Sequence, residues 1–149
     1  MKIGDICKRD VITTTPDARM EEVARLMRNG HVGSVVVVDS ARRPVGIVTD
    51  RDIVVGTLAC GVDPKTVSAG EVMSGSLTTA SPEDDPAWAV KVMRDRGVRR
   101  LPVVDGRGAL TGIVALDDLL EWSLGALGDV VQAIGTERQV ESTRRKAAA

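Results

Sequence analysis

The chain has 149 residues, 43% of them hydrophobic, and 20 Lys and Arg against 21 Asp and Glu give a net charge of −1. This length suits one domain or two small paired ones, and the balanced charge argues against a dedicated nucleic-acid binder, which usually carries a basic field. No apolar run approaches the ~18 residues of a membrane span, and the N-terminus lacks a signal peptide's apolar stretch, so we expect a cytoplasmic protein without membrane contact.

The first predicted unit has the order strand, helix, two strands and helix. A β-branched run at residues 11–14 predicts the first strand, and residues 35–38 and 45–48 predict the two strands of a hairpin. A second helix is expected from residue 50 to about residue 60. The first helix has a buried stripe at helical spacing and is expected to end at Gly30. Its stripe consists of Met20, Val23, Ala24 and Met27.

The second predicted unit repeats this order. Its strands are predicted at residues 77–80, 101–104 and 110–114. Asp85 and Pro86 form a start signal for its first helix, because Asp is a good N-cap and Pro suits the first helical position. Gly97 is expected to end that helix, and a last helix is expected from near Leu116 past Trp122.

The chain beyond the second unit is expected to be a helical tail. Its apolar residues Leu127, Val130, Val131 and Ile134 have helical spacing, whereas Glu137 to Ala149 is polar and is expected to fray or to extend from the body. We therefore divide the chain into two repeats, a linker and a partly disordered tail. The boundaries are 1–60, 61–69, 70–124 and 125–149.

The two units are copies of one another. Residues 4–54, shifted by 66 positions, fall on residues 70–120 without a gap. Gly4-Asp5-Ile6 falls on Gly70-Glu71-Val72, and Gly46-Ile47-Val48 falls on Gly112-Ile113-Val114. Matches that include glycine and aspartate concern turns as well as hydrophobicity. Each copy alone is small for independent folding, so we expect two pseudo-symmetric copies that share a buried face, with the functional site between them.

This pattern resembles a tandem pair of cystathionine-β-synthase (CBS) domains, the Bateman module. The resemblance rests on the strand ends Val37-Val38-Asp39 and Pro102-Val103-Val104-Asp105, on residues 46–52, and on the doubled β-α-β-β-α order. It covers residues 4 to about 122. It implies an α/β (α+β) fold in which two three-stranded sheets pack together and leave two clefts for adenosine-containing ligands.

The segment that begins at Gly46 carries the main candidate site. Thr49 and Asp52 bracket a helix N-terminus, where free N–H groups and the helix dipole favour anions. The Thr49 hydroxyl can bond a phosphate or ribose oxygen, and Asp52 can accept from both ribose hydroxyls. In the family the matching Thr and Asp contact phosphate and ribose. The alternative is a plain helix cap, because Thr at the N-cap with Asp three residues later is a common capping arrangement.

The two copies differ at their candidate sites. Ala115 replaces the threonine in the second copy while Asp118 is retained, so we expect that site to be weaker or empty. Arg99 and Arg100 precede a strand of the second copy, at positions where the family often places basic residues that reach the phosphates held by the other repeat. They would serve the site of Asp52, since the arginine fork binds phosphate bidentately. The alternative for this pair is a solvated surface.

The predicted function is a ligand-sensing regulatory module and not an enzyme. One His and two distant Cys give no metal cluster of usual spacing. The expected ligand is AMP, ADP, ATP or S-adenosylmethionine, with no catalytic cofactor, and a separate effector protein is a candidate partner. The alternative is a structural interaction module with vestigial clefts. The candidate ligand-binding residues are Thr49, Asp52, Arg99, Arg100, Gly46, Thr13, Thr14 and Asp118, with His31 as an added donor to the other cleft.

The helices are also expected to form a homodimer. In the family, such helices pair two modules into a disc with a two-fold axis. The alternative is that these residues fill the core of their own chain. The apolar residues assigned to this surface are Met20, Val23, Met27, Val90, Met93 and Trp122.

Overall fold

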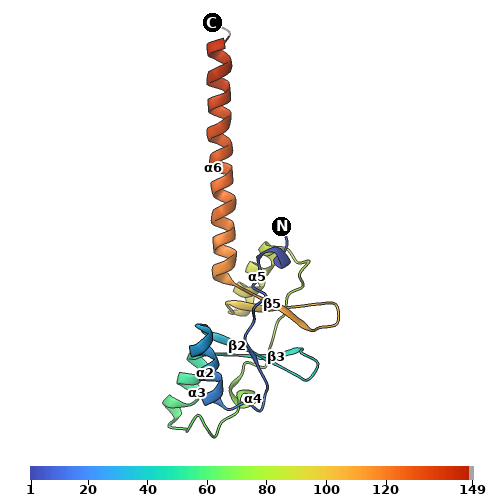
Figure 1. Ribbon diagram of the computed structural model, residues 1–149, viewed down its shortest axis with the longest axis vertical. Coiled ribbons are helices and arrows are strands. Elements are labelled where there is room, and N and C mark those ends of the chain that lie inside the picture. The colour runs from blue at the N-terminus through green and yellow to red at the C-terminus, as the bar shows by residue number, and fades with distance from the viewer. Residues whose placement is uncertain (148–149) are drawn as a thin grey trace.

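The computed structural model describes residues 1–147 and has two similar halves, from which one long helix projects (Figure 1). Each half combines a small sheet with helices, which confirms the predicted α/β class. The helices are α1 (Ile3–Ile6), α2 (Met20–Gly30), α3 (Asp50–Gly56), η1 (Leu58–Cys60), α4 (Ala69–Val72), α5 (Pro86–Arg96) and α6 (Leu116–Ala147). The strands are β1 (Thr13–Thr14), β2 (Ser34–Val38), β3 (Pro44–Thr49), β4 (Arg100–Val104) and β5 (Leu110–Ala115).

The two sheets differ by one strand. The first has the order β1-β2-β3, with β1 parallel to β2 and β2 antiparallel to β3, whereas the second contains β4 and β5 alone. The strand predicted at residues 77–80 is therefore wrong, because only Ala80 pairs, as an isolated bridge. In the first half the Val36 N–H donates to the Ile12 carbonyl. The equivalent residue of the second half is Pro102, which has no N–H to donate.

Helices α2 and α5 are each followed by a residue in the left-handed conformation. Gly97 caps α5 with φ of 63°, as predicted, and α2 ends at Gly30, as predicted, but the left-handed cap of α2 is the next residue. Gly30 is the last helical residue, and His31 takes the left-handed conformation with φ of 51°. The shift of 66 positions explains this difference, because it aligns His31, and not Gly30, with Gly97.

Two other helix boundaries were partly predictable. Asp85 caps α5 as expected, since its carboxylate accepts a 2.7 Å hydrogen bond from the backbone N–H of Ala87. The second helix of the first half is shorter than expected. It ends at Gly56, and after Thr57 the residues Leu58–Cys60 form the separate 3-10 turn η1.

The first helical turn of each copy packs on the other copy. The N–H of Gly4 donates to the carbonyl of Pro82, and the N–H of Gly70 donates to the carbonyl of Pro16, both at 2.8 Å. The repeats defined by sequence therefore exchange their leading segments. This exchange ties the halves together and carries the segment after α4 back to the first half.

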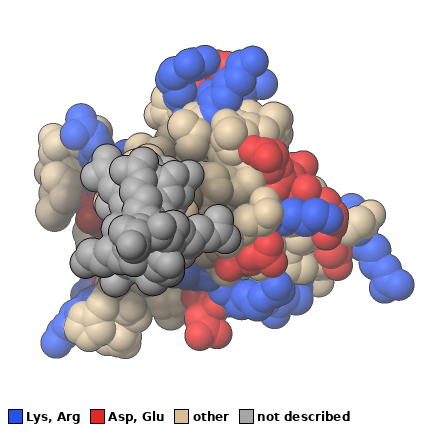
Figure 2. All heavy atoms as spheres, turned by 90° about the horizontal axis from the view of Figure 1, so that it is seen from above, with Lys and Arg blue, Asp and Glu red and all other residues tan. Residues whose placement is uncertain are grey.

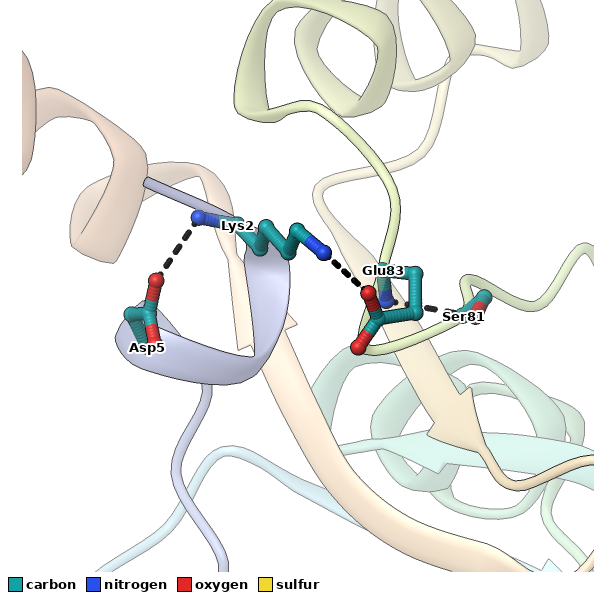
Figure 3. Close-up of polar contacts among 4 residues, drawn as sticks. All are labelled: Lys2, Asp5, Ser81 and Glu83. Carbon is teal, nitrogen blue, oxygen red and sulfur yellow. Dashed lines mark hydrogen bonds and ion pairs between the residues drawn. The ribbon is translucent and has the colours of Figure 1, made fainter.

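The exchanged helices also contribute to the cores. Ile3 of α1 is fully buried in the core of the second half, and Ala69 of α4 is fully buried in that of the first. Lys2 adds an exposed ion pair to Glu83, next to α1 (Figure 3). A third cluster joins the two sheets through Val36, Val38 and Leu110, with partly buried neighbours that include Ile47 and Ile113.

The apolar helix residues assigned to a dimer surface mostly fill this chain's own cores, which corrects their assignment. Met20 and Val23 are fully buried, and Met27 and Met93 are nearly so, because both helices turn their stripe toward a sheet. Of that set, only Val90 is exposed, and Trp122 is half-buried. The large apolar side chains exposed on α3, η1 and the start of α6 are Val54, Val55, Leu58, Leu120 and Leu124.

The helix expected past Trp122 continues without a break as α6, which spans 32 residues and projects from the body (Figure 1). The predicted stripe beyond Leu127 falls on Val130, Val131 and Ile134, whose side chains lie outside the described part. The last two residues of the predicted tail, 148–149, also lie outside the described residues. On the face seen from above, basic and acidic side chains lie beside one another (Figure 2), in keeping with the balanced composition.

Candidate functional site

A cavity of about 340 Å³ lies between the two halves. We name it the first cleft. From β3 and α3 it is lined by Ile47, Thr49, Arg51 and Asp52. From the segment after α4 it is lined by Ser74, Ser76, Leu77 and Thr78, and from the segment leading into β4 by Gly97, Val98, Arg99 and Arg100. The volume falls at the lower end of the range of small-molecule sites.

Thr49 and Asp52 form a complete capping box at the start of α3. The Thr49 N–H and hydroxyl both donate to Asp52 Oδ2 at 2.7 Å, and the Asp52 N–H donates to Thr49 Oγ1 at 3.2 Å. The capping role considered from sequence is therefore real, and it fixes the carboxylate at the cleft. It uses Oδ2, which leaves Oδ1 for another donor. The helix has only seven residues, so its dipole is a smaller attraction for anions than the sequence suggested.

Arg99 and Arg100 come to the same cavity from the second half. Arg99 is exposed and donates to Asp117 Oδ1 at 3.3 Å. Arg100 lines the first cleft and a second one, and its Nη2 lies 3.8 Å from the position that a Cβ on Gly33 would occupy. The structure thus brings two arginines to the cavity that holds Thr49 and Asp52.

Four candidate residues do not line the first cleft. Gly46 is buried, and a Cβ there would lie 2.4 Å from Met73 Sδ, so this glycine allows close packing. Thr13 and Thr14 form β1 beside β2, and Thr14 is buried. The remaining candidate, Asp118, lies at the second cleft.

Sequence reasoning missed the contribution of the segment after α4. Ser74, Ser76, Leu77 and Thr78 line the first cleft, although none was a candidate. The internal repeat alone gave no signal, because the aligned residues of the first copy, among them Lys8 and Asp10, are known to line the second cleft only from the structure. Only the exchange of leading segments shows which cleft each segment reaches.

The second cleft is smaller, at about 240 Å³, and two of its carboxylates, Asp117 and Asp118, are ion-paired within the chain. Asp118 Oδ2 accepts from the Ala115 N–H at 2.9 Å, and its Oδ1 lies 2.8 Å from Lys8 Nζ. The hydrogen bond from the Lys8 ammonium to Asp118 and the negative charge of Asp118 raise the pKa of Lys8 above its ordinary 10.5. Ala115 offers no hydroxyl, and His31 lines the cleft as the sequence suggested.

Two further findings bound the chemistry of the described residues. Within residues 1–147, no group of three or more His, Cys, Asp or Glu side chains is placed to hold a metal ion. No helix in this part of the chain is both long enough and apolar enough to span a membrane.

Comparisons with known proteins find matches over most of the chain. The family model for the CBS domain matches residues 3–56 and 69–125. An uncharacterized protein of Methanopyrus kandleri is 40% identical over 121 residues, which are 81% of this chain and 62% of that protein. The chain thus spans less than two thirds of that relative's length.

Two solved structures share the fold and contain adenosine compounds. The CBS domain pair of protein MJ0100, in complex with methylthioadenosine and S-adenosylmethionine, has a TM-score of 0.76 at 25% identity, covering 85% of this chain and 98% of that one. The cytosolic domain of the Mg²⁺ channel MgtE, in complex with ATP, has a TM-score of 0.70 at 27% identity, covering 80% and 48%.

Proposed function

This chain belongs to the CBS domain family, and we propose that it is a ligand-sensing regulatory module that binds an adenine nucleotide or a related adenosine compound in the first cleft. The observation that carries this proposal is the meeting of Thr49 and Asp52 with Arg99 and Arg100 at one cavity, from opposite halves of the chain. The adenosine compounds bound by related CBS structures support the ligand class.

Asp52 is the residue that we assign to the ribose. Its Oδ2 is held by Thr49, so the carboxylate is fixed before a ligand arrives. Among the ion pairs of the described residues, none involves Asp52, and Oδ1 is therefore available to ribose hydroxyls. Hydrogen bonds to a charged acceptor are worth about 1.5–3 kcal/mol each.

Arg99 and Arg100 are the residues that we assign to phosphate. Arg99 has to leave Asp117 to do so, and both of these side chains are mostly exposed. An exposed ion pair contributes only about 0.2–1 kcal/mol, so a phosphate can replace it at small cost. The bidentate fork of arginine then offers stronger, charge-assisted bonds.

The adenine ring would lie against aliphatic side chains. The chain has no Phe or Tyr, and the first cleft offers Ile47, Leu77 and Val98 instead. This set of residues binds a nucleoside and its phosphates, so we propose binding and not catalysis.

The test is a titration of the purified chain with AMP, ADP, ATP and S-adenosylmethionine, by calorimetry and by thermal unfolding. At least one compound is expected to bind at one dominant site per chain. At a concentration of 100 times Kd it should stabilise the native state by about 2.7 kcal/mol. Failure of all four compounds to bind at millimolar concentration would contradict the proposal and favour an interaction module with vestigial clefts.

We also propose that the module forms a homodimer through the outer faces of α3, η1 and α6. Val54, Val55, Leu58 and Leu120 are each more than half exposed there, and exposed apolar surface is what a partner subunit could cover. Light scattering should give twice the chain mass of 15.8 kDa. Leu58→Asp should shift the protein to the monomer, whereas a wild-type monomer at micromolar concentration would refute the dimer.

A further inference from the structure

Lys8 and Ser74 occupy equivalent places in the two clefts. The shift of 66 positions aligns them, and each follows the exchanged helix of its copy. The Lys8 N–H donates to the Ile113 carbonyl at 2.9 Å, and the Ser74 N–H donates to the Ile47 carbonyl at 3.1 Å. Since an equivalent backbone hydrogen bond places both residues, the main difference between the clefts at this position is the side chain.

The side chain at this position determines whether the carboxylate of the cleft is ion-paired. Lys8 Nζ lies 2.8 Å from Asp118 Oδ1, and the Asp118 side chain is only 9% exposed. In the first cleft the shorter, uncharged Ser74 stands at this place, and Asp52 is in no ion pair of the described residues. Asp118 therefore has both oxygens engaged, one by Lys8 and one by the Ala115 N–H.

We propose that Lys8 is a tethered competitor that occupies the carboxylate of the second cleft and restricts adenosine ligands to the first. The inference rests on the proposed function, because it takes the ribose contact assigned to Asp52 as the model for Asp118. A ribose in the second cleft has to displace an ammonium that the backbone bridge to Ile113 keeps within reach. The neighbouring Asp117 is also paired, with Arg99, so two of the three carboxylates that line this cleft, Asp117 and Asp118 but not Asp10, have cationic partners among the ion pairs of the described residues.

The charge state of Lys8 supports this competition. Its pKa is raised above the ordinary value by the hydrogen bond to Asp118, so the ammonium remains charged across the physiological range. A ribose hydroxyl is neutral and competes for the same oxygen without that charge. The ion pair is therefore favoured over a second ligand.

A reciprocal pair of substitutions tests the proposal. Lys8→Ser gives the second cleft the side chain of the first, and Ser74→Lys does the reverse. With AMP and adenosine as probes, calorimetry should show one site per chain for the wild type and two for Lys8→Ser. Ser74→Lys should weaken binding at the first cleft at least tenfold. Lys8→Arg keeps a cation and should retain one site.

Lys2→Ser is the matched control for the loss of charge. Lys2 is also an exposed lysine near the N-terminus. It pairs with Glu83 (Figure 3) and lines neither cleft. This variant should keep one site with unchanged affinity. Thermal unfolding of each variant checks folding, which is expected to persist because the bridge to Ile113 uses backbone atoms alone.

The outcomes separate this proposal from the proposed function. If Lys8→Ser binds only one ligand per chain, or if the wild type binds two, the proposal for Lys8 is wrong. The proposed function of the first cleft is unaffected by either result. If the wild type binds neither probe nor the other compounds, the proposed function fails. In that case the proposal for Lys8 is supported only if Lys8→Ser binds a ligand, and it is wrong if that variant also binds nothing.

Discussion

Replacing Asp52 with alanine separates the two roles of this carboxylate, helix cap and ligand contact. The side chain accepts two hydrogen bonds from Thr49, at 2.7 Å each, so its loss leaves the Thr49 N–H without its acceptor. One such bond contributes about 1 kcal/mol. For a chain of this length, that corresponds to a fall in Tm of about 2–4 °C. A cap alone predicts this loss and nothing else.

The proposed ribose contact predicts a second, separate loss in the same variant. Removal of a charged acceptor should cost about 1.5–3 kcal/mol for each hydrogen bond lost. One bond then raises Kd by roughly 10- to 150-fold, since each 1.4 kcal/mol is a factor of ten. Calorimetry with the tightest of the four compounds measures this change, at a temperature well below the Tm of the variant.

Asp118→Ala is the matched control for this experiment. Asp118 holds the equivalent capping position of α6, where it accepts from the Ala115 N–H at 2.9 Å. Its loss should lower stability by a similar amount while affinity at the first cleft stays within about twofold. Equal losses of affinity in both variants, or an unchanged Kd in Asp52→Ala, would refute the ranking of the clefts.

Three further predictions follow from other contacts. Replacing Arg99 and Arg100 together with Gln should bring AMP affinity down to that of adenosine and leave adenosine binding unchanged; a wild type that binds both equally would make the pair a solvated surface. Gly46→Ala should lower the free energy of unfolding by about 1–3 kcal/mol in urea titrations, because its Cβ would lie 2.4 Å from a methionine sulfur, and an unchanged midpoint would contradict that packing. The pKa of Asp105 lies below its ordinary 3.8 because the Ala109 N–H donates to it, so its stabilising effect is present above that pH and is lost as the pH falls through the lowered pKa; an NMR titration at or above 3.8 would contradict this.

The internal repeat made most of the fold predictable. Matching turn residues aligned the two copies of the repeat without a gap. Asp85 and Gly97 marked the ends of a helix where the structure has them. The missing third strand of the second sheet followed from Pro102, whose effect on pairing could be read only once its partner in the ladder was known. Helix periodicity identified buried faces correctly but could not show whether the partner of Met20 or Met93 was this chain or another.

The candidate site was predictable in part for the same reason. Thr49, Asp52, Arg99 and Arg100 were chosen from sequence, and the structure places all four at one cavity. The ion pair between Lys8 and Asp118 was not foreseen, because it depends on the exchange of leading segments between copies. Such an exchange leaves no periodicity in the sequence, since it concerns which copy a segment packs on.

A crystal structure of the chain grown with AMP, ATP or S-adenosylmethionine tests the central claim most directly. The account predicts one ligand per chain in the first cleft, with its ribose hydroxyls within hydrogen-bond distance of Asp52 Oδ1 and, for a nucleotide, its phosphates beside Arg99 and Arg100. A ligand bound against Asp118 with the first cleft empty would contradict it.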